Sequence, residues 1–239
     1  MNAADPMRSP WMHAWAAWPV RASDAVLRGH AWPRSRWALL ALVLGFGGMY
    51  GLVLGSYGGV SPERWWQMGY SAAKVPMLLL LTFGLGLPSF FVVHGLLGLS
   101  RDFPEAVAAL LKTQAAVTVV LASLGPVTAV WYLGAADRDA GYASAKLFNA
   151  LMFGVASVAG QVVLRRAYRP LIARDARHRW LLGLWLGIYA FVGVQMAWLL
   201  RPFIGDPSLP TRFFRPDAWG NAYEALWSAL MAALGVFSG

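Results

Sequence analysis

Five long apolar segments constrain this chain more than any other feature of its sequence. They lie at about residues 37–54, 75–99, 107–133, 145–164 and 180–200. A helix rises about 1.5 Å per residue, so each segment can cross a hydrocarbon core of about 30 Å. In lipid the backbone must satisfy its own hydrogen bonds, and we therefore expect each segment to be a helix.

The amount of charge in the chain supports the same conclusion. Of 239 residues 58% are hydrophobic and only 13% are charged, whereas about a quarter of the residues in a soluble domain are charged. So few charges cannot cover a water-soluble particle. The sequence therefore predicts an all-α integral membrane bundle of five transmembrane helices, which occupies residues 37–200.

Residues 1–36 form a segment rich in Trp and Arg before the first apolar stretch. Trp11, Trp15 and Trp18 would lie on one face of a helix, with their indoles at the depth of the lipid head groups. We expect an interfacial helix that anchors the chain. A disordered tail is the alternative.

Residues 201–239 follow the last long segment as a loop and a shorter apolar stretch. The stretch Ala222–Phe237 holds Glu224 and has fewer than the roughly 20 residues that a span needs. It predicts an amphipathic interfacial helix, and the alternative is a sixth span.

Prolines and small residues divide and pack these segments. Ser61-Pro62 is typical of a helix start, and predicts a short interfacial helix that ends before Pro76. Pro88 and Pro126 lie inside the second and third segments, where we expect kinks. Small residues in the first and fourth segments predict close helix–helix contact: Gly45, Gly47, Gly48, Ala156 and Gly160.

The distribution of Lys and Arg predicts how the bundle is oriented. With Lys112 set aside, alternate compartments carry twelve and seven basic residues, and the richer side is expected to be cytoplasmic. The N-terminus is then cytoplasmic, and the segment from Arg201 onward is periplasmic.

Several classes of function are disfavoured. There is no Cys, no HExxH, no GxSxG and no P-loop, and the four histidines have no metal-ligand spacing. The eleven acidic residues lie in loops or near helix ends, which disfavours a proton-coupled carrier. The net charge of +9 fits contact with anionic lipid better than with nucleic acid.

A few polar side chains lie within the apolar segments. His94 is interpreted as a ligand to a metal or a porphyrin magnesium, a contact to a pigment or lipid, or simply a neutral imidazole bonded to a neighbouring helix. Four amides are expected to form helix–helix hydrogen bonds: Gln114, Asn149, Gln161 and Gln195.

The stretch Gln195–Asn221 combines Pro, aromatic residues and Arg. Prolines stiffen a loop, and aromatic residues with Arg are enriched at interface hot spots. One interpretation is a rigid docking element on the outer face. The other is a loop that plugs its own bundle, with Arg201 paired to Asp206. The candidate docking residues are Arg201, Phe203, Asp206, Phe213, Phe214, Arg215 and Trp219.

Three stretches carry a resemblance to known proteins: KVPMLLLLTFGLGLPSFFVVHGLLG, LASLGPV and QMAWLLRPFIGDP…FFR…WGN. They resemble a group of uncharacterised bacterial multi-pass inner-membrane proteins, distantly similar to the Yip-type five-helix membrane proteins. The resemblance covers about residues 37–222, and the RPFIGDP stretch is its most specific part. It implies a fold and an inner-membrane location, and no reaction.

These observations favour a non-catalytic subunit that packs against, or scaffolds, a larger inner-membrane assembly, such as a photosynthetic or respiratory one. Its partners would be lipids and other membrane subunits, and it would hold bound lipid or contact a bacteriochlorophyll or carotenoid pigment. The alternative is a small-solute transporter or channel with a site between the kinked second and third helices. An intramembrane enzyme, in which His94 meets a second catalytic group, is the weakest hypothesis.

Overall fold

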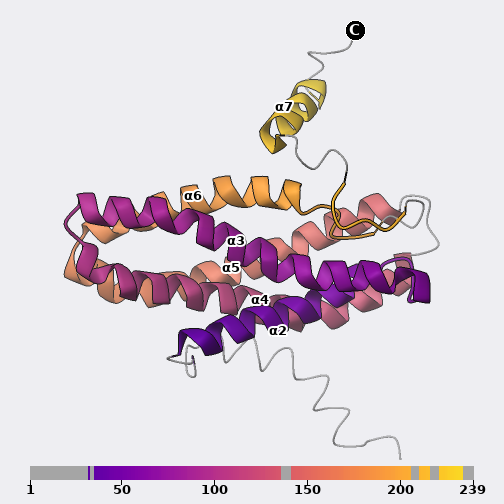
Figure 1. Cartoon of the computed structure of the whole chain (residues 1–239), viewed down its shortest axis with the longest axis horizontal. Coiled ribbons are helices and arrows are strands. Elements are labelled where there is room, and N and C mark those ends of the chain that lie inside the picture. Colours follow the sequence, from indigo (N-terminus) through magenta and orange to yellow (C-terminus); the bar gives the residue numbers. More distant parts are fainter. Residues whose placement is uncertain (1–31, 33–34, 136–140, 206–209, 216–220, 234–239) are drawn as a thin grey trace, which may run out of the picture.

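The structure, a computed structural model, describes residue 32 and residues 35–135, 141–205, 210–215 and 221–233. Five long helices run along the long axis of the molecule (Figure 1): α2 (Arg36–Gly55), α3 (Trp65–Leu96), α4 (Phe103–Ala135), α5 (Gly141–Arg174) and α6 (Arg177–Leu199). Two 3-10 turns, η1 (Pro62–Arg64) and η2 (Ser100–Asp102), precede α3 and α4, and a short helix, α7 (Ala222–Ala233), stands apart from the bundle.

The prediction of a five-helix membrane bundle is confirmed. All five long helices have the length and apolar composition to cross a membrane, and the described part of the chain contains no strand. Helices of 32 to 34 residues, such as α3 and α5, are about 50 Å long, so their ends extend beyond a core of about 30 Å. The interfacial position of α7 stays a prediction, and residues 1–31 lie outside the described part.

The predicted boundary at Pro76 is wrong. No separate interfacial helix precedes it, because α3 continues without a break through both Pro76 and Pro88. Pro126 likewise lies inside the continuous helix α4. A proline removes one backbone hydrogen bond, and here the packing of the helix on both sides of each proline outweighs that loss.

Close backbone contact joins α2 to α3. A Cβ atom on Gly51 would lie 2.6 Å from the Cα atom of Ala72, and one on Gly55 would lie 2.6 Å from that of Met68. Only glycine fits at such a distance. Of the glycines expected to make such contacts, Gly45 has open space around it, so the tightest approach lies further along the helix than the sequence predicted.

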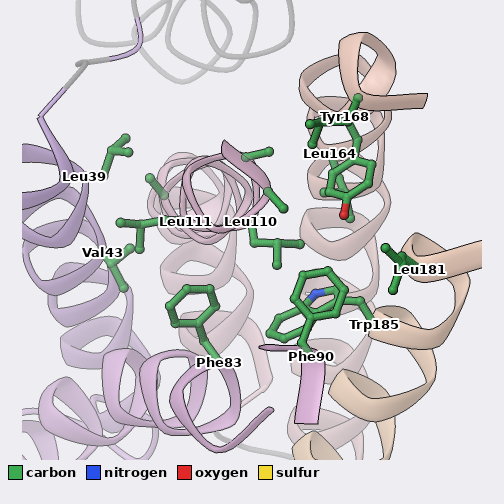
Figure 2. Close-up of a cluster of buried hydrophobic side chains, with 14 of the residues drawn as sticks. Leu39, Val43, Phe83, Phe90, Leu110, Leu111, Leu164, Tyr168, Leu181 and Trp185 are labelled. Carbon is green, nitrogen blue, oxygen red and sulfur yellow. The ribbon is translucent and has the colours of Figure 1, made fainter. Parts of the chain in front are cut away.

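Two apolar clusters fill the two halves of the bundle. The first, which we call the histidine end because His94 and His178 lie beside it, contains large apolar side chains from all five long helices (Figure 2), among them Leu39, Phe90, Leu110, Leu164 and Trp185. The second, the lysine end, near Lys74 and Lys146, is rich in tyrosine: Tyr50, Tyr57 and Tyr132 are all buried there.

Candidate functional site

The loop that follows α6 folds back onto the lysine end. Four of its backbone oxygens accept hydrogen bonds from buried or half-buried side chains, the last of them Gly205 O, to which Arg64 donates at 3.2 Å. Lys74 Nζ donates to Pro202 O at 2.8 Å, Ser71 Oγ to Phe203 O at 2.5 Å, and Tyr142 Oη to Ile204 O at 3.3 Å. Residues 201–205 therefore plug the bundle, whereas Asp206 lies outside the described residues.

Lys74 is the most unusual part of this arrangement. The second apolar segment was predicted to begin just after it, at residue 75, but Lys74 lies within α3 and is fully buried. Its ammonium group donates to Pro202 O and lies 4.8 Å from the centre of the Phe213 ring. A buried cation is costly unless it is paired, so the loop and the lysine stabilise each other.

A cavity of about 610 Å³ lies beside this loop. Its walls come from α5, the end of α6, one residue each of α2 and α3, and the loop. The lining residues are Leu54, Leu78, Tyr142, Lys146, Asn149, Ala150, Phe153, Ala197, Arg201, Pro202, Phe203, Ile204 and Arg215. Asn149 was predicted as a helix–helix contact, whereas Arg201, Phe203 and Arg215 were predicted as docking residues. The fold brings all four to one cavity.

The charge of the cavity has one sign. Lys146, Arg201 and Arg215 line it, and its described lining contains no acidic side chain. Lys146 Nζ lies 4.7 Å from the centre of the Tyr142 ring, and the Arg201 guanidinium lies 3.3 Å from that of Trp198. Aromatic faces thus hold two of the cations in place.

Much of the remaining lining is apolar, including Leu78, Ala150, Phe153 and Ala197. The described lining offers neither a carboxylate nor an imidazole to act as a general base. The cavity can therefore bind a molecule with an acidic head and an apolar body.

Asn149 lines the cavity and connects three helices. Tyr50 Oη in α2 donates to Asn149 Oδ1 at 3.1 Å, and Asn149 Nδ2 donates to Tyr132 Oη in α4 at 2.6 Å and to Ala145 O at 2.7 Å. The amide is thus held by the bundle while one side of the residue faces the cavity.

The other predicted amides lie elsewhere. Gln114 Oε1 accepts a hydrogen bond from Tyr189 Oη at 2.9 Å, which links α4 to α6. Gln195 Oε1 accepts one from Ala222 N at 3.1 Å, which attaches the start of α7 to α6. Gln161 is half-buried in α5. None of these three lines the cavity.

Some of the other predicted site residues lie within the described part of the chain and some lie outside it. His94 is fully buried near the end of α3, and its Nδ1 lies 2.9 Å from Phe90 O of its own helix. Phe213 and Phe214 pack edge to face at the lysine end, with ring centres 4.8 Å apart. Trp11, Trp15, Trp18 and Trp219 lie outside the described residues.

Tyr142 and Lys146 were not predicted as site residues, although their spacing along the helix could have indicated them. Tyr142, Lys146, Asn149 and Phe153 recur at spacings of four, three and four, which places them on one face of a helix. Such a polar stripe at the start of an apolar helix could have indicated a site. Nothing comparable marks Lys74, which depends on a loop 128 residues away.

The chain was compared with known proteins, and no family model, curated protein or solved structure matches it. The resemblance to the bacterial multi-pass group stays an expectation based on its motifs.

Proposed function

We propose that this chain is a non-catalytic inner-membrane protein that binds a lipid with an acidic head group in the cavity at its lysine end. One observation carries the proposal: three cations and a largely apolar set of side chains line the same cavity of about 610 Å³. Basic pockets between transmembrane helices suit the phosphate of a lipid head group.

The depth of the cavity supports a lipid rather than a soluble anion. It lies near the ends of α5 and α6, whose lengths bring it to the level of the head groups. Lys146 and Ala150 are exposed on α5, so the cavity borders the surface that faces lipid. A phosphate would lie against Lys146, Arg201 and Arg215, with an acyl chain on the apolar walls.

By the count of basic residues, the lysine end is periplasmic and the histidine end is cytoplasmic. The lipid would then come from the outer leaflet of the inner membrane. Phosphatidylglycerol and cardiolipin have the required chemistry.

Thermal unfolding of the purified chain, followed by its Trp fluorescence, tests the proposal. We expect phosphatidylglycerol to raise the melting temperature, and phosphatidylcholine or inorganic phosphate at equal concentration to leave it unchanged. The double variant Lys146→Ala, Arg215→Ala should lose the response. The control Arg165→Ala, Arg169→Ala removes two exposed charges near the other end of α5 and should keep it.

Three results would contradict the proposal. An equal shift with phosphatidylcholine would mean that the acidic head is not recognised. An equal shift with inorganic phosphate would mean that no acyl chain is needed. A loss of response in both double variants would mean that acidic lipid binds to surface charge in general.

We also propose that the chain works as a subunit of a larger membrane assembly. The ring of Phe191 is exposed on the bundle's α6, and α7 is attached to it through stacking with the ring of Tyr223, with centres 4.7 Å apart. Trp180 of α6 and Trp227 of α7 are exposed as well. Migration of native, gently solubilised material as a lone 26.0 kDa chain would count against a subunit role.

A transporter is the second candidate, since a cavity beside Asn149 is the kind of site that it would need. Two observations favour lipid binding over it. Only one of the four amides lines the cavity, and the histidine end is filled with large apolar side chains (Figure 2). Solute flux in proteoliposomes, with Asn149→Leu as the comparison, separates the two candidates.

A further inference from the structure

Two histidines from different helices lie together at the histidine end. His94 belongs to α3 and His178 to α6, both side chains are fully buried, and their ring centres are 5.9 Å apart. The ring of Tyr168, from α5, lies 6.0 Å from that of His178 and is also fully buried. Three helices thus bring three polar side chains together, with His178 between the other two.

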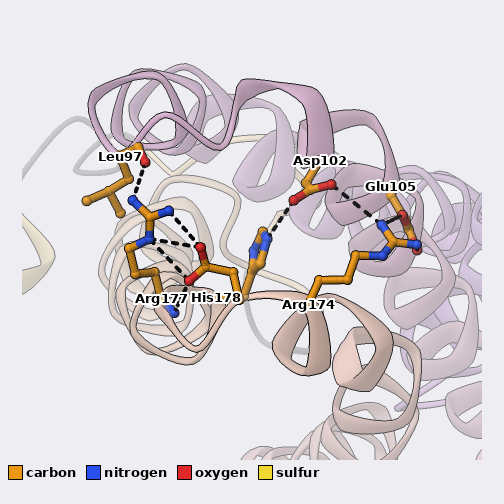
Figure 3. Close-up of polar contacts among 7 residues, drawn as sticks. Leu97, Asp102, Glu105, Arg174, Arg177 and His178 are labelled. Carbon is orange, nitrogen blue, oxygen red and sulfur yellow. Dashed lines mark hydrogen bonds and ion pairs between the residues drawn. The ribbon is translucent and has the colours of Figure 1, made fainter.

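Each histidine has one ring nitrogen held by an oxygen that only accepts hydrogen bonds. His94 Nδ1 lies 2.9 Å from the backbone oxygen of Phe90, and His178 Nε2 lies 3.0 Å from Asp102 Oδ2 (Figure 3). Both of these nitrogens therefore carry the proton. In a neutral imidazole the opposite nitrogen then has a free lone pair.

Those opposite nitrogens are the unusual feature. His94 Nε2, His178 Nδ1 and the hydroxyl oxygen of Tyr168 are all buried, and none has a hydrogen-bond partner among the described residues. Buried polar atoms are nearly always paired, so an unpaired one calls for an explanation. Here three such atoms belong to neighbouring side chains.

We propose that His94 Nε2, His178 Nδ1 and the Tyr168 oxygen bind one divalent cation of the Zn²⁺ class. A histidine that ligates a metal usually donates its other N–H to a carboxylate or a backbone carbonyl, and the two histidines show one case of each. Zinc binds imidazole nitrogen at about 2.0–2.1 Å, so the ring centres of two ligands to one ion lie roughly 5–6 Å apart. The observed 5.9 Å fits that range.

The surroundings give such an ion a structural role. Asp102 belongs to η2, which Gly98, with a φ of 70°, turns back beneath the end of α3. Arg174 pairs with Glu105 at 2.5 Å and with Asp102 at 3.5 Å (Figure 3). The ion would connect α3, α5 and α6 directly, and η2 through Asp102.

Imidazole suits zinc, copper and nickel better than magnesium or calcium, so Co²⁺ is a suitable spectroscopic probe for the site. The full chain, purified without a polyhistidine tag and stripped with a chelator, is titrated with CoCl₂ and then with ZnCl₂. We expect one equivalent of Co²⁺ to bind with visible d–d absorption and to be displaced by Zn²⁺. Metal analysis should find one ion per chain.

Variants locate the site. His94→Ala and His178→Ala should each abolish saturable binding, and Asp102→Asn should weaken it by about 10- to 100-fold, as the loss of a partner that orients a ligand does. Tyr168→Phe keeps the shape of the ring and should shift the Co²⁺ spectrum. The control His13→Ala, His30→Ala removes the other two histidines and should bind as the unchanged chain does.

Far-UV circular dichroism of each metal-free variant shows whether it is folded, and if an alanine variant is not, Asp102→Asn and Tyr168→Phe carry the test. The absence of saturable Co²⁺ binding in the unchanged chain would overturn the proposal. Loss of binding in the His13→Ala, His30→Ala control would overturn it too.

Discussion

At the histidine end the helices meet through large apolar side chains, whereas at the lysine end they meet through glycine backbones, buried tyrosines and a folded loop. The first region contains Phe90 and Trp185, with ring centres 4.9 Å apart, inside a continuous apolar cluster (Figure 2). The second contains Asn149, bonded to tyrosines of two other helices, next to a cavity.

This difference in packing between the two ends shows how one bundle can combine a closely packed region with a ligand-sized cavity. The end of α5 and the start of α6 are separated only by Asp175 and Ala176 at the histidine end, which keeps the helices together there. At the lysine end residues of α5 and the end of α6 line a cavity. A closely packed end fixes the helices, and the other end is free to take a ligand.

The largest expected effect tests the apolar packing of the histidine end. Phe90→Ala should lower the free energy of unfolding by about 3–4 kcal/mol, because it leaves a cavity among side chains that cannot collapse fully. Titration with a denaturing detergent in mixed micelles measures this. Phe91→Ala is the matched control, since that neighbouring ring is 53% exposed, and an equal loss in both would mean that the cluster is not a packed core.

The next effect tests the backbone contact between α2 and α3. Gly51→Ala should cost about 2–3 kcal/mol, because its new methyl group meets the backbone of Ala72 and the helices must separate. The same detergent titration applies. Gly45→Ala, where a Cβ atom meets nothing within 4 Å, should be neutral or slightly stabilising, and a similar cost at both glycines would contradict the close approach.

A smaller effect tests the polar centre of the lysine end. Asn149→Leu should cost about 1–2 kcal/mol, since it leaves Tyr50 and Tyr132 without their partner. Gln161→Leu, a half-buried amide on the same helix, should change stability by less than about 0.5 kcal/mol. The fluorescence of the surrounding aromatic residues would report a local change, and an unaltered Asn149→Leu variant would mean that the hydrogen bonds contribute nothing.

The smallest effect depends on pH and lies in the turn between α5 and α6. Hydrogen bonds from Arg177, at 2.6 to 3.1 Å, lower the pKa of the Asp175 carboxyl to about 2. A lowered pKa stabilises the folded state above the unfolded pKa of about 4, and this stabilisation is lost as the pH falls towards 2. The small difference in melting temperature between the chain and Asp175→Asn should therefore shrink over that range, and a constant difference would contradict the ion pair.

Parts of the candidate sites could be read from the sequence and parts could not. Asn149, Arg201, Phe203 and Arg215 were all singled out, each for a reason other than a shared cavity. His178 was noted only as a scattered histidine, because it lies 84 positions from His94 and no spacing rule connects them. Spacing detects ligands on one helix, and these two come from different helices.

The sequence by itself determined the class of protein and its five helices. Whether a segment is solvated by lipid depends on its own run of residues. The length of each segment and its lack of charge therefore predict a membrane-spanning helix. The start of α3 is an exception, because the sequence predicted a separate helix before Pro76. There α3 packs against α2 and continues through the proline.

Only the tertiary structure decided which polar groups meet. In lipid the inner and outer faces of a helix are both apolar, so the sequence does not reveal which face packs inward. The burial of Lys74 under the loop, and the meeting of His94 with His178, follow from contacts between distant segments. These contacts depend on the shape of the bundle rather than on local composition. They bring together the residues of both candidate sites, at the lysine end and at the histidine end.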